Sequence, residues 1–128
     1  MSWGKKNKYN AVRQTYNGYS YDSKFEAQWA ANLDMLKNAG EIIDWDRQYT
    51  VEMVAHDSSG NPKMSMKHKI DFRVHELDGT YTLLEAKGFE TADYRIRKRW
   101  LEKLWLPEHS DYRYQVVKQG QGWRAMSA

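Results

Sequence analysis

The chain has 128 residues, which is enough for one hydrophobic core and too few for two domains. Its formal net charge of +3 and its pI near 9.0 fit an anionic partner without requiring one. Cysteine is absent, which excludes disulfides and thiolate metal sites. No apolar run approaches the length of a signal peptide or a membrane span, so we expect a cytoplasmic protein with no membrane partner.

The N-terminal residues 1–10 are polar and contain three lysines but no acid. We expect a flexible basic arm, which is either a solvated tail or a segment that lies along a phosphate backbone. Its lysines are Lys5, Lys6 and Lys8. The segment that follows, residues 11–21, has Asn17-Gly18 between two short runs of strand-forming residues, which predicts a hairpin.

Residues 23–39 carry the clearest helix pattern. Ser23 can cap the helix, Glu26 stands at the third helical position as in a capping box, and Gly40 suits the C-terminal stop. The apolar stripe consists of Phe25, Trp29, Leu33 and Leu36. Because a capping box alone would explain the glutamate, its role stays open on spacing alone.

The next two segments are less regular. Residues 42–55 alternate in part and are expected to form an extended segment or a strand pair. Residues 56–68 contain Ser58-Ser59-Gly60-Asn61-Pro62 and are expected to form a loop. His68, at its end, could approach a phosphate, but we expect a loop histidine without a role.

The central stretch, residues 69–87, is predicted to form two strands joined by a turn. A two-residue loop would set Phe72 opposite Glu85, whereas a three-residue loop over residues 77–79, with its glycine left-handed, pairs Phe72 with Leu84. The second register is favoured because it gathers one largely apolar face. That face contains Ile70, Phe72, Val74, Thr82, Leu84 and Ala86.

The same register sets Asp71 opposite Glu85, with Cβ atoms roughly 5 Å apart. Lys87 follows Glu85 on the same face. Two like charges this close are destabilising unless a cation lies between them, so we infer a metal site. The alternative is that Glu85 and Lys87 are solvated charges on an edge strand.

A second helix is predicted from Thr91, its cap, to about Trp105, ending before Pro107. Its buried side is expected to contain Ile96, Trp100, Leu101, Leu104 and Trp105. Another side is basic, and phosphate binding and plain solvation are about equally good explanations of it. Residues 112–118 read as a last strand, and residues 119–128 as a flexible tail, so one domain spans residues 11–118.

The order of these elements resembles the core of the PD-(D/E)XK nucleases: a helix with Glu, a strand with Asp, a strand with Glu-x-Lys, a basic helix and a strand. More narrowly, YDSKFEAQWAANLDMLKNAGEI, HKIDFRV, LLEAKGF and YRIRKRW resemble a small, largely phage-encoded, single-domain family of that superfamily. This family is similar to Holliday-junction resolvases. The resemblance covers residues 9 to 118, with Ile70 rather than proline before Asp71.

The resemblance implies an α/β fold with a restriction-endonuclease-like core, in which a mixed central β-sheet is flanked by helices. It also implies that Glu26, Asp71, Glu85 and Lys87 occupy the active site. The carbonyl of Ala86 would be a further metal ligand beside Asp71 and Glu85, with Glu26 as another candidate. Mg²⁺ is the expected ion because it prefers oxygen ligands, and Mn²⁺ is expected to substitute for it.

The expected function is that of a Mg²⁺-dependent endodeoxyribonuclease, structure-selective on branched DNA, acting as a homodimer in the cytoplasm of a phage host or bacterium. The alternatives are a nicking or debranching nuclease, a restriction-type nuclease subunit, and a non-catalytic DNA-binding module on a nuclease-like scaffold. The residues expected to contact DNA are Lys5, Lys6, Lys8, Lys24, Arg95, Lys98 and Arg99.

Overall fold

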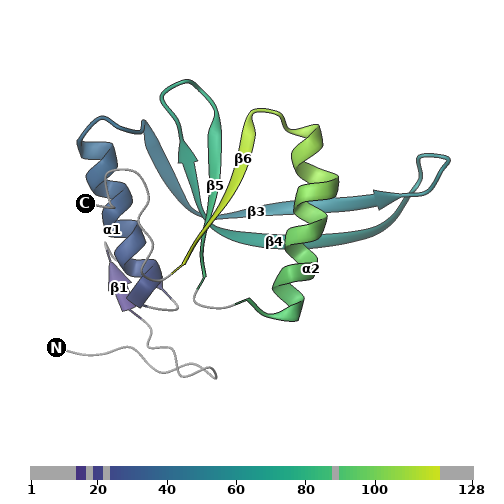
Figure 1. The fold of residues 1–128 in the computed structure, drawn as a ribbon, viewed down its shortest axis with the longest axis horizontal. Helices are drawn as coiled ribbons and strands as arrows, with labels where there is room; N and C mark the ends of the chain where they lie inside the picture. Colours follow the sequence, from purple (N-terminus) through teal and green to yellow (C-terminus); the bar gives the residue numbers. More distant parts are fainter. Residues whose placement is uncertain (1–13, 17–18, 22–23, 88–89, 119–128) are drawn as a thin grey trace.

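The computed structural model describes residues 14–16, 19–21, 24–87 and 90–118 (Figure 1). The predicted basic arm, the capping Ser23, the Asn17-Gly18 turn and the C-terminal tail lie outside these ranges. None of the helices in the described ranges is long and apolar enough to cross a membrane.

The first elements are a small hairpin and a helix. Strands β1 (Gln14–Tyr16) and β2 (Tyr19–Tyr21) pair antiparallel, with Tyr16 opposite Tyr19, as expected for a two-residue loop. Helix α1 (Lys24–Asn38) follows and confirms the prediction to within one residue at each end. At its end, Gly40 has φ +78° and its N–H bonds to the carbonyl of Lys37, while the next N–H bonds to the carbonyl of Leu36. These two bonds satisfy carbonyls that the helix leaves open.

A four-stranded mixed sheet forms the centre of the protein. Its strands are β3 (Asp44–His56), β4 (Pro62–His75), β5 (Tyr81–Lys87) and β6 (Tyr112–Lys118), in this spatial order. The first three are antiparallel, and β6 is parallel to β5. This mixed sheet is what the sequence predicted, with the last strand at the predicted residues.

The predicted loop over residues 56–68 is wrong. Only residues 57–61 turn the chain, where the carboxylate of Asp57 accepts from the N–H groups of Ser59 and Asn61 at 2.9 Å. His56 is the last residue of β3, and residues 62–68 belong to β4, which runs beside β3 as a long hairpin past α2 (Figure 1). The alternation of apolar Met64 and Met66 with polar residues was the strand signal, and the neighbouring turn residues obscured it.

The second helix is shorter than predicted and ends in two irregular turns. Helix α2 (Ala92–Trp100) is capped by the side chain of Thr91, as predicted, and continues into a π-helical turn (Leu101–Trp105) and a 3-10 turn (Leu106–Glu108) that contains Pro107. The predicted buried side is wrong at two positions, because Ile96 and Leu104 are 51% and 37% exposed. Tyr94, which lies two helical turns before the buried Leu101 and on the same side, is buried instead.

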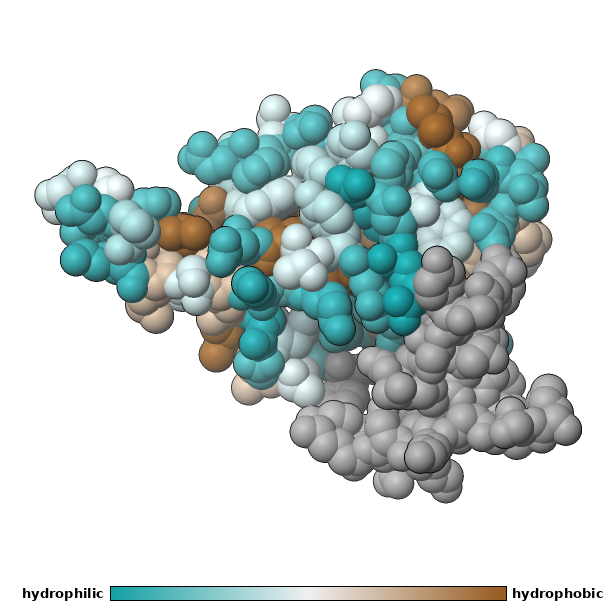
Figure 2. All heavy atoms as spheres, turned by 180° about the vertical axis from the view of Figure 1, so that it is seen from behind, coloured by the Kyte–Doolittle hydropathy of each residue, from teal (hydrophilic) through white to brown (hydrophobic). Residues whose placement is uncertain are grey.

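Two hydrophobic clusters fill the two faces of the sheet. The first lies under α1 and contains Trp29, Ala30, Leu33, Leu36, Ile42, Phe72, Val74, Leu84, Ala86 and Val117. The second lies under the π-helical turn and contains Val51, Met53, Ile70, Leu83, Leu101 and Trp105. Because Leu83 and Leu84 are neighbours on β5 and belong to different clusters, the two helical segments cover opposite faces of that strand (Figure 1). The apolar side chains that remain exposed form separate patches on the face shown in Figure 2.

Candidate active site

The turn between β4 and β5 sets the register on which the candidate site depends. The N–H of Glu76 bonds to the carbonyl of Thr80 at 2.9 Å, and Gly79 has φ +87°. Phe72 is paired with Leu84. This confirms the three-residue loop with a left-handed glycine that burial favoured in the sequence. The predicted apolar face is wrong at Ile70, which packs in the second cluster, whereas Phe72 and Leu84 pack in the first.

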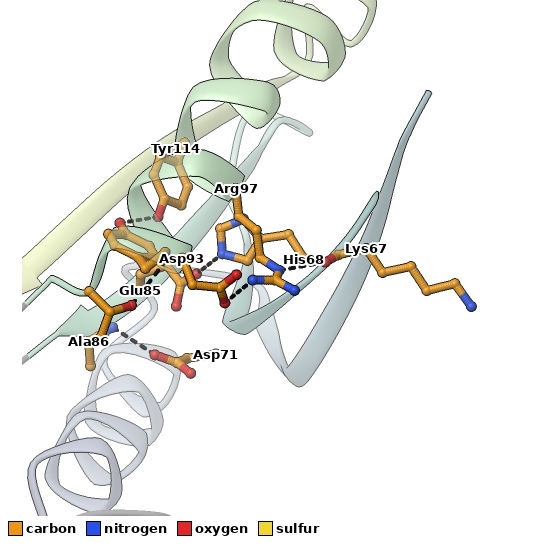
Figure 3. A network of polar contacts seen from close by, with 10 residues as sticks. Lys67, His68, Asp71, Glu85, Ala86, Asp93, Arg97 and Tyr114 are labelled. Atoms are coloured by element: carbon orange, nitrogen blue, oxygen red, sulfur yellow. Dashed lines mark hydrogen bonds and ion pairs between the residues drawn. The ribbon is translucent and has the colours of Figure 1, made fainter. Parts of the chain in front are cut away.

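The pairing of β4 with β5 ends at Phe72 and Leu84, the residues next to Asp71 and Glu85, and the Asp71 side chain reaches across to β5. Its Oδ2 accepts a hydrogen bond from the backbone N–H of Ala86 at 2.8 Å (Figure 3). The aspartate is therefore held in place by the strand that carries the glutamate and the lysine of the predicted site.

Four predicted residues interact electrostatically at this position. Burial raises the pKa of Asp71 well above its ordinary value, and the charges of Glu85 and Glu26 raise it further. The hydrogen bond from Ala86 and the charge of Lys87 lower that pKa, but by less. The structure thus brings Glu26 of α1 within electrostatic range of Asp71 on β4, which a capping role alone would not require.

Glu85 is the most deeply buried member of this group, with 1% of its surface exposed. Its Oε1 lies 2.5 Å from Nε2 of His68, which is also buried, and its buried Oε2 has no hydrogen-bond partner (Figure 3). An ionised carboxylate oxygen left unpaired in the interior is costly unless something compensates it.

His68 was missed as a site residue because the sequence placed it in a loop. Strand β4 instead carries it inward, opposite Val51, three residues before Asp71. The signal that could have found it is the apolar alternation of Met64 and Met66, which His68 continues.

Two tyrosines cover Glu85 and Lys87. The Nζ atom of Lys87 lies 4.5 Å from the ring centroid of Tyr94, and the hydroxyl of Tyr94 lies 2.6 Å from that of Tyr114 on β6. Burial raises the pKa of both tyrosines, and the charge of Glu85 raises each further, while their mutual hydrogen bond lowers that of Tyr94 and raises that of Tyr114. Both hydroxyls are therefore neutral at physiological pH, and the ring of Tyr94 offers the lysine a cation–π contact rather than an ion pair.

The oxygen atoms of these side chains are of the kind that bind a divalent cation, although they are not arranged as a complete metal site. Within the described residues, no three histidine, aspartate or glutamate side chains are placed to hold a metal ion together. The oxygen chemistry nevertheless fits Mg²⁺, because Asp71 and Glu85 lie on adjacent strands and the unpartnered Oε2 of Glu85 is an available ligand.

The predicted DNA-contacting residues are distributed unevenly. Arg95 and Arg99 are exposed on α2 and Lys98 is half-buried, whereas the neighbouring Arg97 is bound to Asp93 and to the carbonyl of Lys67 (Figure 3). Lys24 is the first residue of α1. Lys5, Lys6 and Lys8 fall in the N-terminal segment outside the described residues.

The fold and this cluster define a small α/β protein with acids, a histidine and a lysine gathered on the central strands of a mixed sheet. A family model with the description "Protein of unknown function (DUF1064)" matches residues 6–123, so the chain belongs to this family. No curated protein and no solved structure matches the chain.

Proposed function

We propose that this protein is a metal-dependent endonuclease that hydrolyses DNA phosphodiester bonds. The observation that carries the proposal is that the carboxylate of Asp71 interacts electrostatically with Glu85 and Glu26 and with the cation of Lys87. The charges of Glu85 and Glu26 raise the pKa of Asp71, and such like charges destabilise a fold, so their presence is best explained by a cation that they bind. A purely DNA-binding module would gain nothing from such a group, because it repels phosphate.

The residues that would hold the ion are Asp71, Glu85 and the carbonyl of Ala86, with Glu26 as a candidate fourth ligand. When bound, Mg²⁺ or Mn²⁺ would polarise the phosphate and provide a more acidic water. Lys87 would offset the negative charge that grows on the phosphate oxygens. The tyrosine cover would exclude bulk water and hold the lysine in place.

The order of elements is a second, weaker support. Helix α1 brings Glu26, β4 brings Asp71, β5 brings Glu85 and Lys87, and α2 precedes a strand parallel to β5. This is the order that the resemblance to PD-(D/E)XK nucleases implies. Analogy at the level of the fold does not choose among the substrates of such enzymes.

For the substrate, we propose branched DNA such as four-way junctions, cut by a homodimer. One domain of this size supplies one active site, whereas resolving a junction needs two symmetric nicks. A two-fold dimer would supply two sites with matching geometry.

The proposal is tested by incubating the protein with end-labelled linear, nicked, flapped and four-way DNAs in Mg²⁺, Mn²⁺ or EDTA. We expect metal-dependent nicks close to the branch point, abolished in Asp71→Asn and Glu85→Gln, with DNA binding retained or stronger in both variants. Sedimentation at micromolar concentration measures the oligomeric state. DNA binding without cleavage in either metal would favour the binding module, and equal cutting of linear DNA by a monomer would refute junction selectivity.

A further inference from the structure

We propose that His68 is a positioning residue: it holds Oε1 of Glu85 by a hydrogen bond and leaves Oε2 as the oxygen that faces a divalent cation. The hydrogen bond is a feature of the structure, whereas the identity of the ion rests on the proposed function. His68 is not itself a ligand of the cation, and it acts by orienting Glu85.

The first argument is the environment of the pair. The side chains of His68 and Glu85 are 4% and 1% exposed, and Nε2 lies 2.5 Å from Oε1. A hydrogen bond to a buried carboxylate is stronger than one at the surface, because water does not compete for either partner. The bond therefore fixes which carboxylate oxygen is occupied.

The second argument is the state of the imidazole. Its Nδ1 is buried and has no hydrogen-bond partner. A proton on Nδ1 would leave a donor unsatisfied, so the tautomer with its proton on Nε2 suits the site, and Nε2 donates to Glu85. This arrangement resembles the way outer residues orient the ligands of metal sites in general.

The third argument is that the ring cannot turn freely. It packs edge-on against Tyr94, with centroids 5.9 Å apart, and against Tyr114, with centroids 6.2 Å apart. Tyr94 is also the ring beneath Lys87. One aromatic cluster therefore fixes both the histidine that orients Glu85 and the lysine of the same site.

The chain contains a matched control on the same strand. His75 places Nε2 2.5 Å from Oδ2 of Asp46, but these side chains are 28% and 40% exposed. The same carboxylate oxygen also accepts from Nε of Arg73 at 2.8 Å. This pair has the same chemistry as the His68–Glu85 pair and lies away from the candidate site.

The experiment compares His68→Gln, which keeps a donor near the position of Nε2, with His68→Leu, which has none, and with His75→Leu as control. Calorimetry and electron paramagnetic resonance measure Mn²⁺ binding to the full chain. We expect the Kd for Mn²⁺ to rise about 10- to 100-fold in His68→Leu, to stay within a few-fold of wild type in His68→Gln, and to be unchanged in His75→Leu.

Unchanged Mn²⁺ affinity in His68→Leu would overturn the inference, and so would an equal loss in the Leu and Gln variants. If the wild-type chain and Glu85→Gln bind Mn²⁺ equally weakly, the proposed function fails as well. If His68→Leu does not fold, ¹⁵N NMR spectra of the wild-type protein without metal show which nitrogen of the His68 ring carries the proton, and so test the hydrogen bond directly. We expect a protonated Nε2 whose signal shifts in Glu85→Gln, and a ring protonated on Nδ1 alone would overturn the inference.

Discussion

Gln48 of β3 lies opposite Asp71 of β4, at a position that the pairing of the two strands skips between Arg47–Phe72 and Tyr49–Ile70. Among the residues that the structure describes, Gln48 is the only one other than glycine with a positive φ, at 56°. The left-handed backbone turns the strand at this point, while the register of the two strands stays the same on both sides of it. The strand that faces Asp71 is therefore bent where the carboxylate reaches across to β5.

The bend has a visible effect on packing. Trp45 packs edge-on against Phe72 in the cluster under α1, whereas Tyr49 packs against the cluster on the other face. Both residues are at odd positions, and a regular strand would place them on one face. The turn at Gln48 lets one hairpin contribute to both cores.

We predict that Gln48→Gly will be neutral or stabilising and that Gln48→Val will lower the free energy of unfolding by ~1–2 kcal/mol. A β-branched residue is strongly disfavoured in the left-handed region, and glycine is not. Urea denaturation measures both changes. Thr50, which is exposed in the regular part of the strand, is the control position: valine should be tolerated there and glycine should destabilise. The same rank order at both positions would contradict the left-handed backbone.

Local patterns predicted much of this fold but not its long-range details. The hairpin of β4 and β5 could be predicted because the alternation of Phe72 and Val74 and the glycine of the turn agree on one register. The kink at Gln48 has no sequence signature, since glutamine carries no preference for a left-handed backbone. The Tyr94–Tyr114 contact joins elements that are distant in sequence, so periodicity within either segment does not reveal it.

The raised pKa of Asp71 gives a pH-dependent prediction for the metal-free protein. Aspartate titrates near 3.8 in the unfolded chain and well above that value in the folded one, so the native state binds the proton more tightly. The charge of Asp71 therefore lowers stability increasingly as pH rises above 3.8. Asp71→Asn, which keeps an acceptor for Ala86, should raise the Tm at pH 8 in EDTA by ~4 °C per kcal/mol of repulsion removed, and have little effect near pH 3.

Asp46 is a control residue, because its pKa is shifted in the opposite direction to that of Asp71. Burial would raise its pKa, but hydrogen bonds from His75 and Arg73 outweigh burial and lower it. Its contribution to stability is present above pH 3.8 and is lost as pH falls below that value, so Asp46→Asn should lower the Tm at pH 8. If Asp71→Asn also melts lower at pH 8, the carboxylates are not crowded as the structure indicates.

For Lys87 we expect a graded series of effects on cleavage. Lys87→Ala should slow the chemical step by about 10²-fold, the scale of losing one group that stabilises the transition state. Tyr94→Leu should slow it about 2- to 30-fold, which corresponds to a cation–π contact of ~0.5–2 kcal/mol. Tyr94→Phe keeps the ring and should stay near wild type. Single-turnover rates at saturating metal separate these effects, and a Phe variant as slow as the Leu variant would place the role in the hydroxyl instead.

Glu26→Gln separates the two roles that the sequence left open for this residue. Glutamine can still serve in a capping box, so a residue that only caps α1 would tolerate the change. Because the charge of Glu26 raises the pKa of Asp71, we expect a strong loss of cleavage with an unchanged or higher Tm. Glu41→Gln, an exposed change just beyond the helix, should leave both quantities as they are. Full activity in Glu26→Gln would return this residue to a structural role.

The basic side of α2 can be tested by comparing two exposed arginines, Arg95 on this helix and Arg113, whose charge acts on Asp78. Arg95 and Arg113 are both exposed, and each makes one long hydrogen bond, to the carbonyl of Glu90 at 3.4 Å and to the hydroxyl of Thr80 at 3.3 Å. Arg95 lies on the helix that follows Lys87, whereas Arg113 pairs with Thr82, at the other end of β5. Reversal to glutamate changes the net charge of the chain equally in the two variants.

We expect Arg95→Glu to weaken binding to all DNAs and to reduce the slope of log K against log salt by ~0.9 for each phosphate that the variant no longer neutralises. Arg113→Glu should leave that slope near the wild-type value, because only general attraction is reduced. Fluorescence anisotropy over a series of salt concentrations measures both slopes in EDTA, where no cleavage is expected. Equal slopes in the two variants would mean that DNA senses only the net charge of the protein, and the basic side of α2 would then be a solvated surface.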